Sequence, residues 1–363
     1  MGALKNVVEP GAIVFVFTVG TLINRRRKIR QDEDPEACAP LLTPSDEVNS
    51  VSIPETSRFR GNLTSRFLAK FPFLMEIWYW NLSYWTYQLA RALTATLIRN
   101  NKAIFSTARD HALSVLFLEH RLGFAVELRL QRLILGYAPG LMDLFATIYY
   151  SHIVVGVAFL VYIYTYLPTH IFRTIRRTIA TNNLIAFCIL TAYRCAPPRL
   201  LPPEYGFADI LHGGPQHTDL DSSSGSAWTN NRFQLTIAAM PSLHFGTSLF
   251  LCICLLRFSP HRVLRFLAPL WPAAMLLTIL ATANHFVLDA LVGAVVPALG
   301  WRWNRLWLVL EPAENWLFWV LRTEKPSPTG KYGARRAWSP SLGQSRDGSP
   351  DSGAGNKRAS LLD

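Results

Sequence analysis

Two short stretches of the sequence carry the residue types of a nucleophilic transfer site. MPSLHFG contains His244, and ANHFVLD contains His285 and Asp289. Both stretches lie at the ends of a long apolar run, where His and Asp are costly unless they are used. In such a set one histidine attacks, the carboxylate orients it, and the other histidine protonates the leaving group. Each histidine alone is equally compatible with a buried, hydrogen-bonded structural role, so it is the combination that favours chemistry.

The spacing of these residues allows a shared site. His244 and His285 are 41 residues apart. Because a helix of about 15–20 residues crosses the bilayer core, a hairpin of two spans would return His285 to the level of His244. His285 and Asp289 are four residues apart and would share one face of a helix. The carboxylate would then bond one imidazole nitrogen and leave the other free.

Three nearby residues predict a phosphate-binding site. Pro241 could begin a helix, whose first unpaired N–H groups favour an anion, and Ser242 adds a hydroxyl group. Arg199 has a planar guanidinium group that can hold phosphate through two hydrogen bonds, although an arginine at a membrane boundary also contacts lipid headgroups. The five cysteines show no CxxC or metal-ligand spacing, and we expect no metal and no cofactor.

Composition indicates a membrane protein. The 363-residue chain is 50% hydrophobic, and its apolar residues are clustered. The net charge of +12 lies in short basic clusters between apolar segments, as the positive-inside rule produces, rather than on one soluble face that would bind nucleic acid. These basic clusters are residues 25–28, 173–177, 257–265 and 302–305.

The predicted fold is an all-α, polytopic membrane bundle of about six to seven transmembrane helices plus an interfacial amphipathic helix. The apolar segments that predict the spans are residues 7–23, 71–98, 141–167, 178–193, 238–256, 263–283 and 285–301. Threading them in order places every basic cluster on the cytosolic side. His244, His285 and the loop 194–236 then face the lumen or the exterior.

The chain divides into four predicted parts: residues 1–30 form an N-terminal transmembrane anchor, residues 31–65 a flexible cytosolic linker, residues 70–305 the membrane domain, and residues 323–363 a disordered cytosolic tail. A signal peptide is the alternative for the first apolar segment, but its basic flank is on the wrong side.

The segment 103–135 carries a polar stripe. Glu119, Gly123, Glu127 and Gln131 recur every four residues, which predicts one polar face on an interfacial amphipathic helix. Ordinary salt bridges and a role in shaping the roof of the site are both compatible with this stripe. His152, in the middle of another apolar segment, is better explained by an interhelical hydrogen bond than by catalysis.

Three segments resemble the conserved segments of the type-2 phosphatidic acid phosphatase superfamily: APPRLLPPEYGFAD, AAMPSLHFG and ATANHFVLDALVGA. The resemblance covers roughly residues 70–305 and is closest to the inositolphosphotransferase branch, which includes fungal inositol phosphorylceramide synthase. It implies a metal-independent phosphohistidine mechanism in a helical membrane enzyme. His285 would attack phosphorus with the support of Asp289, His244 would protonate the leaving group, and Arg199 and Ser242 would hold the phosphoryl oxygens.

The resemblance also implies membrane lipids as partners: phosphatidylinositol, ceramide or phosphatidate. The phosphoryl acceptor would be water in a phosphatase or an alcohol such as ceramide in a transferase, and a catalytically silent scaffold or transporter is the alternative from another class. We expect a multi-pass protein of the Golgi or endoplasmic reticulum with a lumenal active site. The family's Arg six residues before the nucleophile is Ile279 here, and Thr282 and Asn284 are the neutral donors that could replace it.

Overall fold

Helices make up all of the regular structure in the part of the chain that is described. The computed structural model describes residues 2–26, 54–211 and 235–326 of the chain. Within these ranges the only β contact is an isolated bridge between Cys195 and Ala238. The prediction of an all-α fold is therefore confirmed for the described residues.

Twelve α-helices follow one another along the described chain: α1 Gly2–Ile23, α2 Leu63–Lys70, α3 Phe73–Ile98, α4 Lys102–Leu122, α5 Glu127–Tyr137, α6 Leu141–Tyr166, α7 Thr169–Ala192, α8 Leu243–Phe258, α9 Arg262–Leu267, α10 Leu270–Ala281, α11 Val287–Trp303 and α12 Glu311–Val320. Four 3₁₀ turns lie between them: η2 Ser57–Phe59, η3 Pro198–Leu200, η4 Pro203–Tyr205 and η5 Asn304–Leu310.

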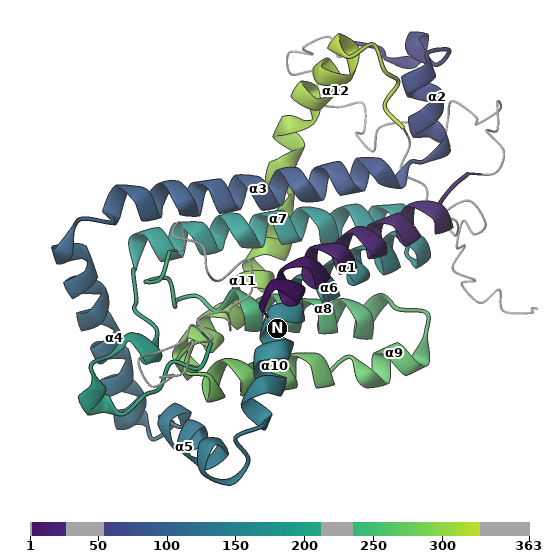
Figure 1. The fold of residues 1–363 in the computed structure, drawn as a ribbon. Coiled ribbons are helices and arrows are strands. Elements are labelled where there is room, and N and C mark those ends of the chain that lie inside the picture. Colours follow the sequence, from purple (N-terminus) through teal and green to yellow (C-terminus); the bar gives the residue numbers. More distant parts are fainter. Residues whose placement is uncertain (1, 27–53, 212–234, 327–363) are drawn as a thin grey trace, which may run out of the picture.

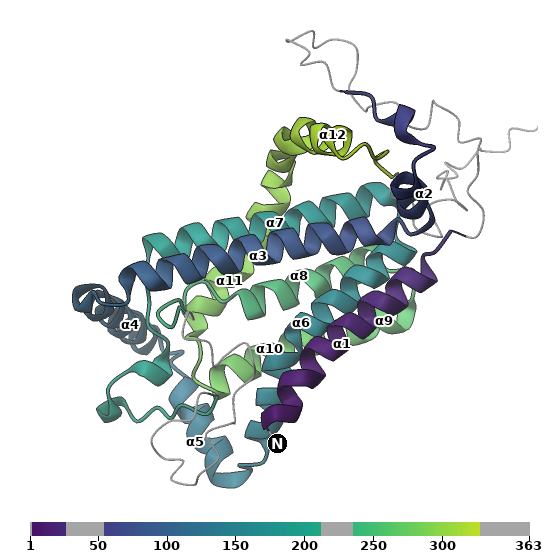
Figure 2. The ribbon, with the colours of Figure 1, turned by 45° about the horizontal axis from the view of Figure 1, so that its top comes forward.

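Most of the helices run side by side, and α4 and α5 lie at one end of the bundle. Helix α3 lies along α7, α1 lies along α6, and α11 packs against both α7 and α8 (Figure 1). Turning the molecule shows α4 and α5 at the end where α3 and α7 finish (Figure 2). A core of buried aromatic and aliphatic side chains joins α3, α6 and α7, with the ring of Phe73 4.9 Å from that of Tyr164.

Length and apolarity identify fewer spans than the sequence pattern predicted. The segments Leu141–Tyr166 and Arg262–Ala281 are long and apolar enough to cross a membrane, with mean hydropathies of 1.9 and 1.8. Val8–Ile23 and Leu243–Phe258 are apolar but shorter. These helices are consistent with a membrane protein, whereas the six to seven predicted spans exceed what this criterion identifies.

Helix α7 begins well before the predicted span 178–193. It starts at Thr169, so the basic residues 173–177 lie in the helix and not in a loop. The reason is a buried ion pair: Arg176 Nη1 lies 2.7 Å from Glu76 Oε2 of α3, and the Glu76 side chain is almost fully buried. The guanidinium group also lies 4.3 Å from the ring centroid of Tyr79. With its charge paired and stacked, Arg176 can sit between two packed helices.

The polar stripe of segment 103–135 lies on two helices instead of one. Gly123 ends α4 with a left-handed φ of 82°, and its N–H bonds the carbonyl groups of Glu119 and His120. Glycine adopts this conformation readily, so the chain turns there and α5 starts in a new direction at Glu127. The turn places both glutamates at the same corner of the bundle.

The segment that precedes α3 meets the C-terminal end of the described chain. Residues 57–65, within the predicted linker, form η2 and the start of α2. Ser65 Oγ accepts a hydrogen bond of 2.8 Å from Glu324 N, and Arg60 forms an exposed ion pair with Glu324. Helix α12, which the sequence pattern did not predict, ends near η2, where the guanidinium group of Arg58 lies 5.2 Å from the ring centroid of Trp319. The rest of the predicted linker up to residue 53, and the predicted tail from residue 327, lie outside the described residues.

Candidate active site

The two predicted histidines lie together where α8 and α11 begin. His244 is the second residue of α8, and His285 directly precedes the N-cap of α11. Their ring centroids are 5.8 Å apart. The helices cross at two glycines: a Cβ atom on Gly293 would collide with the backbone carbonyl of Ser242, and one on Gly246 would collide with the carbonyl of Gly293. Small residues of this kind let membrane helices approach backbone to backbone.

A backbone carbonyl fixes the tautomer of His285. Its Nδ1 atom lies 2.7 Å from the carbonyl oxygen of Ala239, and the side chain is buried. Because a carbonyl oxygen only accepts, Nδ1 must carry the proton, and Nε2 is left with a free lone pair. The sequence pattern predicts this role for Asp289, but Asp289 Oδ2 lies 3.7 Å from Nδ1, beyond hydrogen-bond distance. The residue that holds the tautomer therefore belongs to the segment before α8.

Asp289 is fully buried and links the two helix starts. Its Oδ2 accepts a hydrogen bond of 2.9 Å from the N–H of Phe286, and its backbone carbonyl accepts one of 2.9 Å from Ser242 N. Its Oδ1 has no hydrogen-bond partner among the described residues. The carboxylate is therefore close enough to His285 to stabilise positive charge on the ring without fixing its proton.

Helix α6 supplies a wall of the site. The ring of His244 stacks on that of Tyr149, with centroids 4.2 Å apart, and meets the ring of His152 edge-on at 4.5 Å. His152 Nδ1 lies 2.8 Å from the carbonyl oxygen of Tyr149, so its Nε2 is also unprotonated in the neutral ring. His152, which the sequence favoured as an interhelical hydrogen-bonding residue, instead bonds within its own helix and contacts a candidate catalytic ring.

Arg199 is tethered beside His285 rather than free in solution. Its backbone N–H bonds the carbonyl of Ala283 at 3.0 Å, and its Nε bonds Asn284 Oδ1 at 3.0 Å. Its Nη1 forms an ion pair of 2.8 Å with Asp209 Oδ2. Its Nη2 forms no hydrogen bond to a described residue, so its two N–H groups remain available to a ligand.

The start of α8 differs from the prediction by two residues. Helix α8 begins at Leu243, with Ser242 as its N-cap and Pro241 outside it. The Ser242 hydroxyl is fully buried and accepts a long hydrogen bond of 3.5 Å from Phe245 N. It is therefore engaged in capping. The N–H groups of Leu243 and His244 have no acceptor within the described residues, so the open anion site of this helix is its backbone.

The position of the missing family arginine is part of the core. Ile279 is fully buried, and its carbonyl accepts hydrogen bonds from the backbone N–H groups of Asn284 and His285. The Asn284 amide is also fully used: Oδ1 accepts from Arg199, and Nδ2 donates to Thr282. Asn284 and Thr282 thus hold the loop and Arg199 in place instead of offering free donors to phosphate.

The stripe of α4 and α5 faces this site. Glu119 and Glu127 accept hydrogen bonds from the first turn of α11, and neither forms an ion pair with a described residue. Gln131 exchanges two hydrogen bonds of 2.9 Å with the backbone of Ala208, the neighbour of Asp209. Of the two explanations that the sequence left open, this geometry matches a role in shaping the site.

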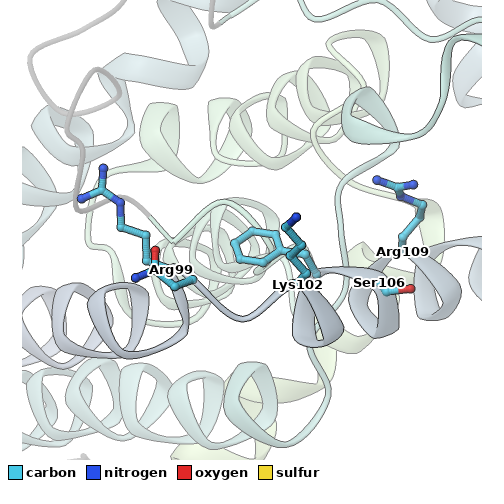
Figure 3. A pocket seen from close by; sticks show the side chains of 6 residues that line it. Arg99, Lys102, Ser106 and Arg109 are labelled. Carbon is cyan, nitrogen blue, oxygen red and sulfur yellow. The ribbon is translucent and has the colours of Figure 1, made fainter.

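A separate basic recess lies where α3 meets α4. It has a volume of about 500 Å³, and three cationic side chains line it: Arg99, Lys102 and Arg109 (Figure 3). The recess contains none of the residues described above, so it is not part of the histidine site.

Comparison with known proteins gives the family. A family model described as the PAP2 superfamily matches residues 113–303, more than half of the chain. Searches of curated proteins and of solved structures find no match. The matched region runs from within α4 to the end of α11 and includes His244, His285 and Asp289. The chain belongs to the PAP2 superfamily.

Proposed function

We propose that this protein is a membrane-embedded phosphotransferase that acts on lipid phosphoesters through a phosphohistidine intermediate. Membership of the PAP2 superfamily supports a phosphatase or phosphotransferase of lipid phosphoesters. The observation that carries the proposal is the hydrogen bond from His285 Nδ1 to the carbonyl of Ala239, which leaves Nε2 as a nucleophile. The ring of His244 lies near enough to serve a substrate bound between the two.

In the first step, His285 Nε2 attacks phosphorus and the bond from phosphorus to the leaving lipid oxygen breaks. His244, protonated, donates its proton to that oxygen. The phosphorylated ring gains positive charge, which the Asp289 carboxylate stabilises from 3.7 Å. The Nη2 group of Arg199 and the open N–H groups at the start of α8 would hold the phosphoryl oxygens.

In the second step, an acceptor hydroxyl attacks phosphorus and the bond to His285 Nε2 breaks. His244 takes the proton of the acceptor and is ready for the next cycle. Water as acceptor gives a phosphatase of the phosphatidate type, which is the second candidate. An alcohol such as ceramide gives a transferase, which is the activity we propose.

The pairing of Arg199 with Asp209 supports a phosphodiester substrate such as phosphatidylinositol. A phosphomonoester carries up to two negative charges, whereas a diester carries one. Here Ile279 is buried in the core, and the charge of Arg199 is partly neutralised by Asp209. A phosphate-binding arginine whose charge is partly neutralised suits the lower charge of a phosphoinositol group. The proposed reaction moves that group from diacylglycerol to a lipid alcohol.

We also propose a multi-pass arrangement with the site on the lumenal face of the Golgi or endoplasmic reticulum. Phe286, the neighbour of His285, packs in one buried cluster with Ile98 at the end of α3 and Leu190 near the end of α7. The arginines of α7 lie near the start of that helix. Basic residues favour the cytosolic side. In this arrangement the C-terminal tail is cytosolic, and sealed lumen-inside vesicles should leave it open to added protease. A protected tail would reverse the arrangement.

The function can be tested with membranes that contain the protein. They are given labelled phosphatidylinositol with ceramide, or phosphatidate alone. Inositol phosphate on ceramide supports the transferase, and free phosphate from phosphatidate supports the phosphatase. His285→Ala should abolish the activity and the labelled phosphoenzyme, whereas His120→Ala, at an exposed position of α4, should retain both. Full activity of His285→Ala would disprove the mechanism.

A further inference from the structure

The first turn of α11 is held by carboxyl groups from three helices. Glu127 Oε1 of α5 accepts a hydrogen bond of 2.8 Å from Val287 N, and Glu119 Oε1 of α4 accepts one of 2.7 Å from Leu288 N. Asp289 accepts from Phe286 N. The first N–H groups of a helix have no partner within it, so these three acceptors fix the turn that follows His285.

The two glutamates share one proton. Both side chains are almost fully buried, and they accept hydrogen bonds from the adjacent N–H groups of Val287 and Leu288, so the two carboxyl groups lie at the same turn. Two buried carboxyl groups held at one turn do not both ionise readily, because like charges raise the cost of the second ionisation. Glu119 Oε2 has no hydrogen-bond partner among the described residues, and no lysine or arginine described there forms an ion pair with either carboxyl group. The pair therefore carries one proton and one negative charge.

We propose that Glu119 and Glu127 are a proton-sharing positioning pair that holds His285 at the start of α11. The catalytic part of this proposal rests on the proposed phosphotransfer. The single negative charge complements the positive end of the α11 dipole. It also excludes an anion from that helix start, while the N–H groups at the start of α8 remain open. The pair would thereby direct the phosphoryl group to the side of His244.

The shared proton has a consequence for stability. Burial raises the pKa of Glu119 above its ordinary value of 4.5, as does the charge of Glu127, while the N–H of Leu288 lowers it. The other titratable groups that face the pair are Asp289 of α11 and the thiol of Cys195. The folded protein keeps a proton that the unfolded chain releases. Stability is therefore greatest at acid pH and falls as the pH rises toward the raised pKa, by a factor of about ten in the folding equilibrium per pH unit.

One test needs no substrate. The thermal midpoint of the purified full-length protein is measured from about pH 6 to about pH 9. Glu119→Gln keeps an acceptor for the Leu288 N–H and is uncharged at every pH, so it imitates the protonated state. The thermal midpoint of the wild type should decrease as the pH rises across this range. The thermal midpoint of Glu119→Gln should decrease less, because its side chain has no proton to release. Asp110→Asn, an exposed carboxylate of the same helix, should follow the wild type. An equal fall in Glu119→Gln would overturn proton sharing.

A second test separates positioning from a merely structural role. Glu119→Leu leaves the Leu288 N–H without an acceptor, and we expect kcat for phosphotransfer to fall about 10- to 100-fold with KM changed less than about twofold. Glu119→Gln should keep kcat within about threefold of the wild type and retain it at alkaline pH. Wild-type kcat in Glu119→Leu would overturn the proposal.

Two further outcomes are distinguishable. If Glu119→Leu does not fold, Glu127→Gln takes its place and should show the same pH dependence as Glu119→Gln. A Glu127→Gln variant whose thermal midpoint and kcat change with alkaline pH as in the wild type would overturn the proposal. If the wild-type protein transfers no phosphoryl group from any of the lipids, the proposed function fails. The substrate-free measurement still decides whether the two glutamates share a proton.

Discussion

Replacing Gly293 with alanine tests whether the crossing of α8 and α11 sets the catalytic geometry. The added Cβ would collide with the carbonyl oxygen of Ser242, which is backbone and cannot rotate away. To reach ordinary van der Waals contact the helices must separate by roughly 1 Å. That separation also stretches the 2.9 Å hydrogen bond from Ser242 N to the carbonyl of Asp289.

The expected effect is larger on catalysis than on folding. His244 lies two residues from Ser242, and a misplacement of about 1 Å at a reacting centre costs about 100-fold in rate. Overpacking of this kind costs about 1–3 kcal/mol in stability, so Gly293→Ala should still fold. Gly156→Ala in α6 is the matched control because no atom lies within 4 Å of its added Cβ. It should keep the wild-type kcat and gain about 0.5–1 kcal/mol from its better helix propensity.

The assay is single-turnover formation of labelled phosphoenzyme by purified protein, with thermal unfolding as the check on folding. Gly293→Ala should form the phosphoenzyme about 100-fold more slowly with the final amount unchanged. A folded Gly293→Ala variant with a rate within about threefold of the wild type would refute the reasoning, as would an equal loss in Gly156→Ala.

Three further changes have definite expectations. His244→Asn should lower kcat about 10²- to 10⁴-fold with a lipid leaving group. The loss should be much smaller with a nitrophenyl phosphodiester, because its leaving group needs no proton. Equal losses with both substrates would contradict the role of His244 as the acid. Asp209→Asn removes the ion-pair partner of Arg199 and should lower kcat/KM about tenfold, and Asp209→Glu should restore part of it. An unchanged kcat/KM in Asp209→Asn would show that the pair does not orient the guanidinium group. Glu76→Gln leaves Arg176 without its partner between α3 and α7 and should destabilise the fold by about 3 kcal/mol without changing kcat; an unchanged thermal midpoint would contradict this.

Periodicity and residue type predict the features of the fold that depend on neighbouring residues in the sequence. The apolar segments predicted most of the first and last residues of α3, α6 and α8 to within a few residues. They did so because side-chain burial follows the period of the helix. The chain distance between His244 and His285 predicted that a hairpin would bring them together, and their rings lie 5.8 Å apart. Their catalytic roles stay predictions.

Non-local contacts could not be predicted in the same way. The acceptor for His285 is a backbone carbonyl, and no side-chain pattern marks it. The start of α7 depends on Glu76, about 100 residues away from its partner Arg176. The contacts of Glu119 and Glu127 with α11 depend on the turn at Gly123 and on the residue at which α11 begins. Both depend on how the helices pack. Their regular four-residue spacing was the feature of the sequence that indicated a common role.

The carbonyl of Ala239 makes the reactive form of His285 independent of any ionisable partner. A carboxylate that held the ring could be protonated as a compartment acidifies, and the ring could then exchange its tautomers. A peptide carbonyl does not titrate in that range, so the proton stays on Nδ1 and Nε2 keeps facing the substrate. In the proposed lumenal setting, one orientation of the nucleophile would serve compartments of different acidity, and acid could act on this ring only at Nε2.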